Sequence, residues 1–307
     1  MEILLLVQTL NGLQLGILLF LIAAGLTLVF GIMDFINLAH GVQYMIGAYL
    51  AATVSLATGS FFLGLLIALP LAFLIGIGME RLILKHLYDR DHLDQVLATF
   101  GIILFLNEFV KIIWGPIPIA YPGPAILSGT IPVMEGFGYP VYRLAIIGAG
   151  IGVAILLWFL VSKTKAGMLV RAGASNARMV SALGVDIQRL FMLVFGFGAM
   201  LAGFAGMMAG PILSVEPGMG DTVLILAFVV IVIGGIGSIR GAFLGAIVVG
   251  LVDTLGRSFL SDILRLFVGP SAANDIGPAL ASMLIYILMA AILFFRPAGL
   301  LPVKSGR

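Results

Sequence analysis

LNGLQLGILLFLIAAGLTLVF, residues Leu10–Phe30, indicates the class of this protein, because the segment contains no charged side chain and few polar ones. A helix needs about 20 consecutive apolar residues to cross the hydrocarbon core of a bilayer, at about 1.5 Å of rise per residue. This segment is long enough to do so. The residues before it, MEILLLVQT, have neither a basic region nor a small-residue cleavage site, so we expect a first membrane helix rather than a removed signal peptide.

The composition of the whole chain agrees with a membrane protein. Of its 307 residues, 62% are hydrophobic and 10% are charged, whereas soluble domains have about 45–50% and about 25%. These values exclude both a soluble globular enzyme and a disordered chain. The long unbroken apolar runs favour helices over a β-barrel, whose strands alternate apolar and polar residues. A net charge of +2 does not suggest nucleic acid as a partner, and the absence of cysteine excludes disulfides and thiolate metal sites.

Nine segments are candidates for crossing the membrane. They are Leu10–Phe30, Val42–Ala57, Phe61–Leu84, Val96–Trp114, Tyr142–Val161, Leu190–Gly210, Thr222–Ile233, Ala242–Phe259 and Ala279–Phe295. The second and seventh are short and adjoin Gly-rich or polar stretches, so we predict broken or re-entrant helices there. The expected fold is an all-α, polytopic transmembrane bundle of about 8–10 helices, forming a single transmembrane domain over residues 1–307.

The connections between these segments predict the orientation of the chain. Gly115–Pro140 is rich in proline and glycine and cannot be a continuous helix. Lys163–Arg189 is the longest basic connection, and basic residues collect on the cytoplasmic side. With the N-terminus outside, the basic residues expected inside are Arg81, Lys85, Arg90, Lys163, Lys165, Arg171, Arg178, Arg189, Arg240, Arg296, Lys304 and Arg307, and those outside are Lys111, Arg143, Arg257 and Arg265. We therefore expect the N-terminus outside and the C-terminus in the cytoplasm.

The basic connection contains a predicted short helix, Ala177–Leu183. Ser175 or Asn176 is suited to cap its start and Gly184 to end it. A helix of about two turns is not stable alone in water, so it needs a surface to lie on. Met179, Val180 and Leu183 share one face of this helix, which lies either on lipid headgroups or in a groove of a cytoplasmic partner.

The few ionisable residues within apolar segments are spaced for pairing along a helix. Asp253 and Arg257 are four residues apart, and Glu108 and Lys111 are three apart. The sequence contains neither a zinc-protease HExxH nor a hydrolase GxSxG motif, and it has no phosphate-binding P-loop. We therefore predict no catalytic residue, metal or cofactor, and energy for any active transport must come from another protein or an ion gradient.

Glycines at small-xxx-small spacing predict close helix packing. The pairs are Gly12/Gly16, Gly148/Gly152 and Gly241/Gly245, four residues apart, and Gly196/Gly203, seven residues or about two helical turns apart. Ordinary tight packing explains most of them, while helices that are weakly interlocked in this way are also able to shear, as alternating access requires.

Five motifs in order along nearly the whole chain resemble the permeases of branched-chain amino-acid ABC importers. They are GLTLVFGIMDFINLAHGVQYMIGAY (Gly25–Tyr49), LATFGI (Leu97–Ile102), TKAGMLVRAGASNARMVSALGVD (Thr164–Asp186), GGIGSIRGAFLGA (Gly234–Ala246) and FRPAGLL (Phe295–Leu301). The first carries the N-x-A-H-G core of the family's first-helix signature. The stretch KHLYDRDHLD departs from the family pattern, and the substrate is left open between branched-chain amino acids, urea, short amides and aromatic acids.

The resemblance implies a non-catalytic subunit of an importer in the bacterial inner membrane. A second permease, two cytoplasmic ATPases and an extracytoplasmic binding protein would complete it, and a heterodimer of permeases is favoured over a homodimer. The alternatives are a secondary transporter driven by an ion gradient, for which no series of buried acids marks a proton path, and a membrane enzyme, for which no polar constellation is present.

The resemblance also implies three groups of functional residues. The group expected to shape the ATPase-coupling loop is Gly167, Arg171, Asn176, Ala182 and Gly184. The groups expected at the gate or translocation path are Asn37, His40 and Gly41, in a polar turn, and Gly234, Gly235, Gly237, Ser238 and Gly241, in a later tight turn. Asn37 and His40 have an alternative role, which is to satisfy backbone groups of a broken helix.

Overall fold

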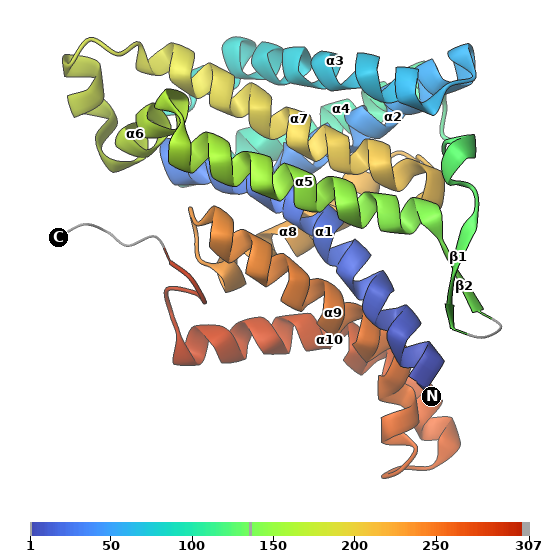
Figure 1. Cartoon of the computed structure of the whole chain (residues 1–307). Coiled ribbons are helices and arrows are strands. Elements are labelled where there is room, and N and C mark those ends of the chain that lie inside the picture. Colours follow the sequence, from blue (N-terminus) through green and yellow to red (C-terminus); the bar gives the residue numbers. More distant parts are fainter. Residues whose placement is uncertain (1, 135–136, 303–307) are drawn as a thin grey trace.

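The computed structural model describes residues 2–134 and 137–302, and within them the chain is a bundle of helices with one short hairpin (Figure 1). The elements are α1 Glu2–Met33, α2 His40–Thr58, α3 Phe61–Leu82, η1 Leu84–His86, α4 His92–Trp114, η2 Ala125–Leu127, β1 Thr130–Met134, β2 Phe137–Pro140, α5 Val141–Lys163, α6 Lys165–Ala182, α7 Ile187–Leu213, α8 Met219–Gly234, α9 Ile239–Leu264 and α10 Pro270–Phe295.

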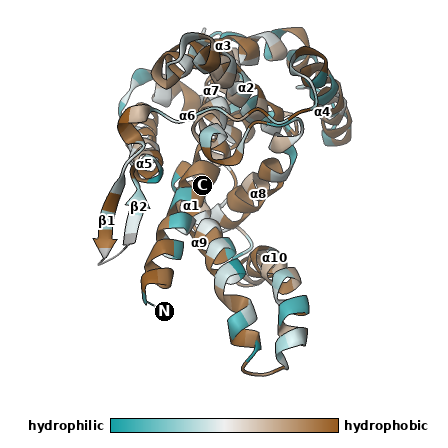
Figure 2. Cartoon of the chain, turned by 90° about the vertical axis from the view of Figure 1, so that its right-hand side faces the viewer, coloured by the Kyte–Doolittle hydropathy of each residue, from teal (hydrophilic) through white to brown (hydrophobic). Residues whose placement is uncertain are grey.

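The predicted all-α membrane bundle is confirmed. Seven helices in the described ranges are long and apolar enough to cross a membrane, namely α1, α3, α4, α5, α7, α9 and α10. The two short predicted spans correspond to α2, which begins with the polar residues His40 and Gln43, and to α8, which has 16 residues. Figure 2 shows hydrophobic residues along most of the helices, with hydrophilic residues gathered toward the tip of the α9–α10 pair.

Helix α1 lies at the centre of the bundle. It packs against α5, α7, α8 and α9. The most apolar window of α1 is 83% buried within the chain, whereas the corresponding window of α10 is 11% buried. The stretch Leu10–Phe30 is therefore surrounded mainly by protein, while α10 leaves most of its apolar side chains for lipid or another subunit.

The connection between α4 and α5 contains structure that the sequence did not predict. Strands β1 and β2 form an antiparallel hairpin with Ile131 opposite Tyr139, at the end of the bundle opposite α6 (Figure 1). Upstream, Ile119 and Val215 exchange backbone hydrogen bonds of 2.8 Å, which fasten this connection to the segment between α7 and α8. The prediction of a non-helical segment was thus incomplete, because strand pairing satisfies its backbone groups.

A proline near the end of α7 explains one further contact of this connection. Pro211 has no N–H, so the carbonyl of Met207, four residues earlier, loses its usual helical donor. The hydroxyl of Tyr121 donates to that carbonyl at 2.9 Å, and Tyr142 donates to the next carbonyl, that of Met208, at 2.8 Å. The loop therefore stabilises the weakened end of α7.

Candidate functional site

The break between α1 and α2 is the first part of the site. Helix α1 ends at Met33, and Asp34 adopts a φ of 49°, which turns the chain out of the helix. The amide of Ile36 donates to Gln95 Oε1 at 3.2 Å, and the amide of Leu38 donates to Thr99 Oγ1 at 3.3 Å. Two side chains of α4 therefore satisfy the backbone of the break, a link that the sequence analysis missed.

The predicted residues Asn37, His40 and Gly41 lie in and just after this break. Asn37 and His40 are fully buried, and His40 Nε2 lies 3.1 Å from the carbonyl oxygen of Ile22 in α1. Gly25 leaves room for the imidazole, since a Cβ on Gly25 would lie 2.9 Å from His40 Nε2. In the described part of the chain the Asn37 side chain makes no hydrogen bond, so the structure joins His40, rather than Asn37, to another helix.

The predicted residues Gly234–Gly241 form the turn between α8 and α9. Gly235 and Gly237 have φ values of 106° and 80°, which only glycine adopts without strain. Ser238 caps α9, because its Oγ accepts from the amide of Gly241 at 3.0 Å. Gly234 and Gly241 pack directly against each other, so their lack of side chains brings the ends of α8 and α9 together.

The segment after α10 completes this turn. The amides of Leu300 and Leu301 donate to the carbonyls of Ile233 and Gly234 at 2.8 and 2.9 Å. Helix termini leave carbonyl groups without intrahelical partners. The FRPAGLL motif therefore acts as a cap for the last turn of α8, a role that the sequence analysis did not identify.

The break after α1 and the turn before α9 meet. A Cβ on Gly31 would lie 2.9 Å from the Cα of Gly237, so α1 and the turn are in backbone contact there. Further along, Gly16 of α1 packs against Ala246 of α9, where a Cβ would lie 2.8 Å from the Ala246 carbonyl oxygen. The end of α1 and the α8–α9 turn thus meet, whereas His40 and Gly41 lie further along the bundle, against Ile22 of α1 and Gly220 at the start of α8.

The predicted coupling helix is the second half of a longer element. Helix α6 begins at Lys165, where Thr164 Oγ1 accepts from the amide of Gly167 at 3.1 Å. It bends at Asn176, whose φ and ψ are −160° and 90°, and Asn176 Oδ1 accepts from the amide of Met179 at 2.9 Å. Of the two predicted caps, Ser175 and Asn176, Asn176 is therefore the N-cap of the second half. The helical first half was not predicted.

The second half of α6 ends in a Schellman motif. Gly184 has a φ of 88°, its amide donates to Ser181, and the amide of Val185 donates to Val180. Met179 and Leu183 are 63% and 78% exposed, whereas Val180 is buried. The three residues predicted to share one face therefore differ in their surroundings. Val180 packs inside the chain, while the large apolar side chains of Met179 and Leu183 point outward.

A cleft of about 1240 Å³ lies beside these groups. It lies between α1, α5, the first half of α6 and the α8–α9 turn, and its walls include Asp34, Arg171, Gly237 and Ser238. Asn37, His40 and Gly41 are not among its lining residues, and neither are Asn176, Ala182 and Gly184. Of the predicted site residues, the cleft therefore brings together Arg171 of the coupling group with Gly237 and Ser238 of the later turn, and the polar-turn group lies outside it.

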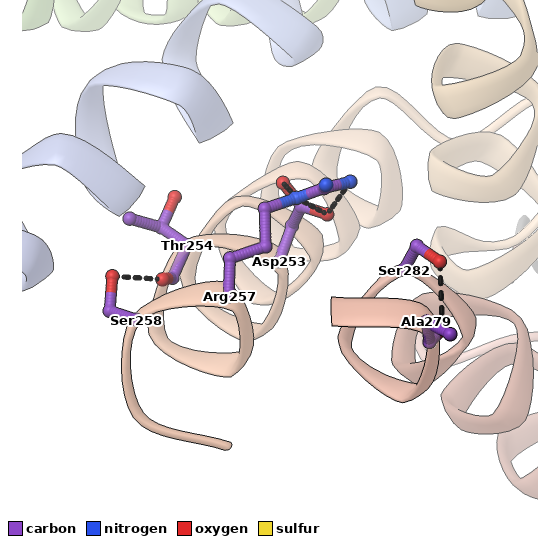
Figure 3. Close-up of polar contacts among 6 residues, drawn as sticks. All are labelled: Asp253, Thr254, Arg257, Ser258, Ala279 and Ser282. Atoms are coloured by element: carbon purple, nitrogen blue, oxygen red, sulfur yellow. Dashed lines mark hydrogen bonds and ion pairs between the residues drawn. The ribbon is translucent and has the colours of Figure 1, made fainter. Parts of the chain in front are cut away.

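Both predicted charge pairs are confirmed. Nε of Arg257 donates to the two carboxylate oxygens of Asp253 at 2.9 and 3.0 Å (Figure 3), and Lys111 Nζ lies 2.6 Å from Glu108 Oε1. Asp253 is buried, and a buried carboxylate requires such a partner. Each of these pairs neutralises two opposite charges along one helix, α9 or α4. In residues 2–134 and 137–302 no three His, Cys, Asp or Glu side chains gather closely enough to hold a metal ion.

Comparison with known proteins gives one consistent result. The family model described as branched-chain amino acid transport system / permease component matches residues 8–293. The chain is 31% identical over 266 residues to the high-affinity branched-chain amino acid transport system permease protein LivH of Escherichia coli K12, covering 83% of this chain and 86% of that protein. It is 30% identical over 308 residues to the permease protein BraD of the corresponding Pseudomonas aeruginosa system, covering 96% and 94%.

A more distant similarity extends to sugar transport. The ribose import permease protein RbsC of Haemophilus influenzae is 23% identical over 237 residues, covering 72% of this chain and 70% of that protein. No solved structure matches the chain.

Proposed function

Since this chain belongs to the family of branched-chain amino acid transport permeases, it is a non-catalytic membrane subunit of an ABC importer, and we propose how its parts divide the work. Such a subunit acts with ATPases and a substrate-binding protein. We propose that the second half of α6 docks on an ATPase and that the cleft beside the first half is this chain's part of the translocation path.

The observation that carries the proposal is the exposed apolar pair on the capped half of α6. Met179 and Leu183 are four residues apart, so they lie on the same side of the helix. Exposed side chains of this size on a two-turn helix favour a hydrophobic groove on a partner. Asn176 then acts as the joint between this docking half and the half that carries Arg171 to the cleft.

A second permease is proposed to cover the open side of the cleft. The most apolar window of α5 is only 22% buried, and Gly148 and Gly152 of α5 face open space in the described structure. Small residues on an uncovered membrane helix favour close packing with another helix. We propose a heterodimer, in which equivalent faces of two different permeases enclose the path and Gly234–Gly241, Asn37, His40 and Gly41 support its gate.

The proposed orientation places α6 in the cytoplasm of a bacterial cell, with the chain in the inner membrane. The excess of basic residues on that side supports this orientation. The N-terminus and the β1–β2 hairpin lie at the end of the bundle opposite α6 (Figure 1), so they face outward, where the binding protein delivers substrate.

The coupling proposal is tested with Leu183→Ser. Burial of a leucine side chain contributes about 1.5–3 kcal/mol, so its loss is expected to weaken ATPase association by about tenfold or more. Association is measured by retention of the ATPases on the purified membrane complex, together with ATP-driven uptake. The matched control is Leu266→Ser, because Leu266 is 80% exposed on the connection between α9 and α10, away from α6.

Unchanged ATPase retention in Leu183→Ser would contradict docking through α6. The gradient-driven alternative is tested separately with the purified chain alone in liposomes. Uphill uptake of a branched-chain amino acid by that chain, driven by an ion gradient and without ATPases, would contradict the importer mechanism.

A further inference from the structure

The cleft has apolar walls and charged groups at one end. Phe20 and Leu28 of α1, Ile155 of α5 and Phe243 of α9 contribute to its walls. Asp34, Arg171 and Arg240 lie on its border and are exposed. None of these three charged residues forms an ion pair with a residue in ranges 2–134 and 137–302. The charges are therefore available to a ligand.

At the charged end of the cleft, the side formed by α1 attracts cations; we call it the cationic-ligand pole. Helix α1 is 32 residues long, and its last turn, with Phe30, Gly31 and Ile32, lines the cleft. The carbonyl end of a helix carries a partial negative charge. The Asp34 carboxylate follows directly after that end, so the helix terminus and the side chain favour the same sign of ligand charge.

The side of the same end formed by the start of α9 attracts anions; we call it the anionic-ligand pole. Helix α9 begins at the cleft with Ser238 as its N-cap, and the first turn carries Arg240. Amide groups at a helix N-terminus favour a carboxylate, and guanidinium groups bind carboxylates with paired hydrogen bonds. Arg171 adds a second guanidinium from α6. The guanidinium charges, the helix dipole and the hydrogen-bond donors on this side therefore all favour an anionic group of the ligand.

The two poles adjoin each other, because Gly31 of α1 and Gly237 of the turn are in backbone contact. Thr27, one helical turn before Gly31, also lines the cleft. Its side chain is 1% exposed, and its Oγ1 has no hydrogen-bond partner in the described structure. A buried hydroxyl without a partner is costly, and a polar ligand in the cleft would satisfy it.

We propose that this cleft is a binding site for a zwitterionic α-amino acid on its way out of the transporter. The ammonium group binds Asp34 and the end of α1. The carboxylate binds Arg240, Arg171 and the start of α9, and the side chain packs against the apolar walls. This inference rests on the proposed function. It adds that the permease itself, and not the binding protein alone, recognises the backbone of an amino acid.

The test measures ligand binding to the assembled transporter in phosphatidylcholine nanodiscs, without the binding protein. Trp158 lines the cleft and reports occupancy, and its signal is isolated as the difference from a Trp158→Phe variant. The fluorescence emission of Trp158 is expected to change with rising leucine concentration and then to reach a plateau. The carboxylate-free analogue 3-methylbutylamine and the ammonium-free analogue 4-methylpentanoate are each expected to bind about tenfold more weakly or worse, since each loses a charge-assisted interaction.

The charge variants make the test specific to each pole. Arg240→Gln is expected to lower the affinity for leucine about tenfold and to abolish the preference for leucine over 3-methylbutylamine. Asp34→Asn is expected to weaken leucine similarly and to abolish the preference over 4-methylpentanoate. Arg240→Lys retains most of the binding. The matched control is Arg90→Gln, which removes an exposed arginine outside the cleft and leaves leucine binding unchanged.

ATP-driven leucine uptake with the binding protein is measured in parallel, so that the two proposals fail separately. Normal uptake with no saturable Trp158 response, or with analogue preferences untouched by both charge variants, overturns the binding site alone. A Trp158 response to phosphatidylglycerol but not to leucine also overturns it and assigns the cleft to an anionic lipid. Absence of branched-chain amino acid uptake in the unmodified complex overturns the proposed function instead.

Discussion

At the scale of single residues, Gln95 connects three separate parts of the chain. Its Oε1 accepts from Ile36 in the break after α1, and its Nε2 donates to the carbonyls of Leu87 and Arg90 at 3.3 and 3.1 Å. The side chain is buried. Buried backbone groups need hydrogen-bond partners, and one amide side chain supplies them to three such groups.

We predict that Gln95→Leu destabilises the protein. Leucine has a similar size but leaves buried donors and acceptors unpaired, at about 1–3 kcal/mol for each unsatisfied group. Thermal unfolding of the purified protein in detergent measures the loss. The control is Gln188→Leu, because Gln188 is exposed at the start of α7. Equal melting temperatures for Gln95→Leu and the unmodified protein would show that the break is held by other contacts.

At the scale of elements, the packing of α1 on α9 depends on the absence of side chains. Gly16 meets the Ala246 carbonyl, while Gly152, on α5, has nothing within 4 Å. The sequence presents both glycines in the same spacing pattern. Only the first is part of a helix contact in this chain, so a shared pattern corresponds to two different environments.

We predict opposite results for the same substitution at these two positions. Gly16→Ala forces α1 and α9 apart and is expected to cost about 1–3 kcal/mol of stability. Gly152→Ala places a methyl group in open space and gains helix propensity, by up to about 1 kcal/mol. Thermal unfolding of the isolated chain compares them, and a destabilising Gly152→Ala together with a neutral Gly16→Ala would contradict the helix arrangement.

Elements whose determinants are local were predictable from the sequence. The apolar segments gave the long helices because length and hydropathy suffice, and Asn176 and Gly184 marked the ends of the short helix because capping depends on neighbouring residues. The β1–β2 hairpin was missed although it is local, because Pro132 and Gly138 interrupt the pattern that predicts strands. The Gln95 link was missed because it joins segments that are far apart in the sequence. Likewise, no local pattern indicated that Asp34 and Arg240 would border one cleft.

At the scale of the whole molecule, the two ends of the bundle differ. One end carries α6, the α8–α9 turn and the segment after α10, and the other carries the N-terminus and the β1–β2 hairpin (Figure 1). Under the proposed orientation, the first end meets the motor subunits and the second meets delivered substrate. Energy and cargo therefore reach the permease from opposite sides.

We predict that single cysteines report this orientation, because the chain has none of its own. Ser128, beside the hairpin, and Asp89, between α3 and α4, are both exposed. In spheroplasts, a membrane-impermeant maleimide is expected to label Ser128→Cys directly and Asp89→Cys only after the membrane is permeabilised. The reverse pattern would show that the N-terminus and the hairpin face the cytoplasm.

The hydrogen bonds from Leu300 and Leu301 to the end of α8 have a consequence for biosynthesis. The ribosome makes α8 well before it makes these leucines, with α9 and α10 in between. Until translation has passed Leu301, the carbonyls of Ile233 and Gly234 therefore lack these two donors. A nonsense mutation upstream of Leu300 removes both donors and leaves the last turn of α8 without this cap.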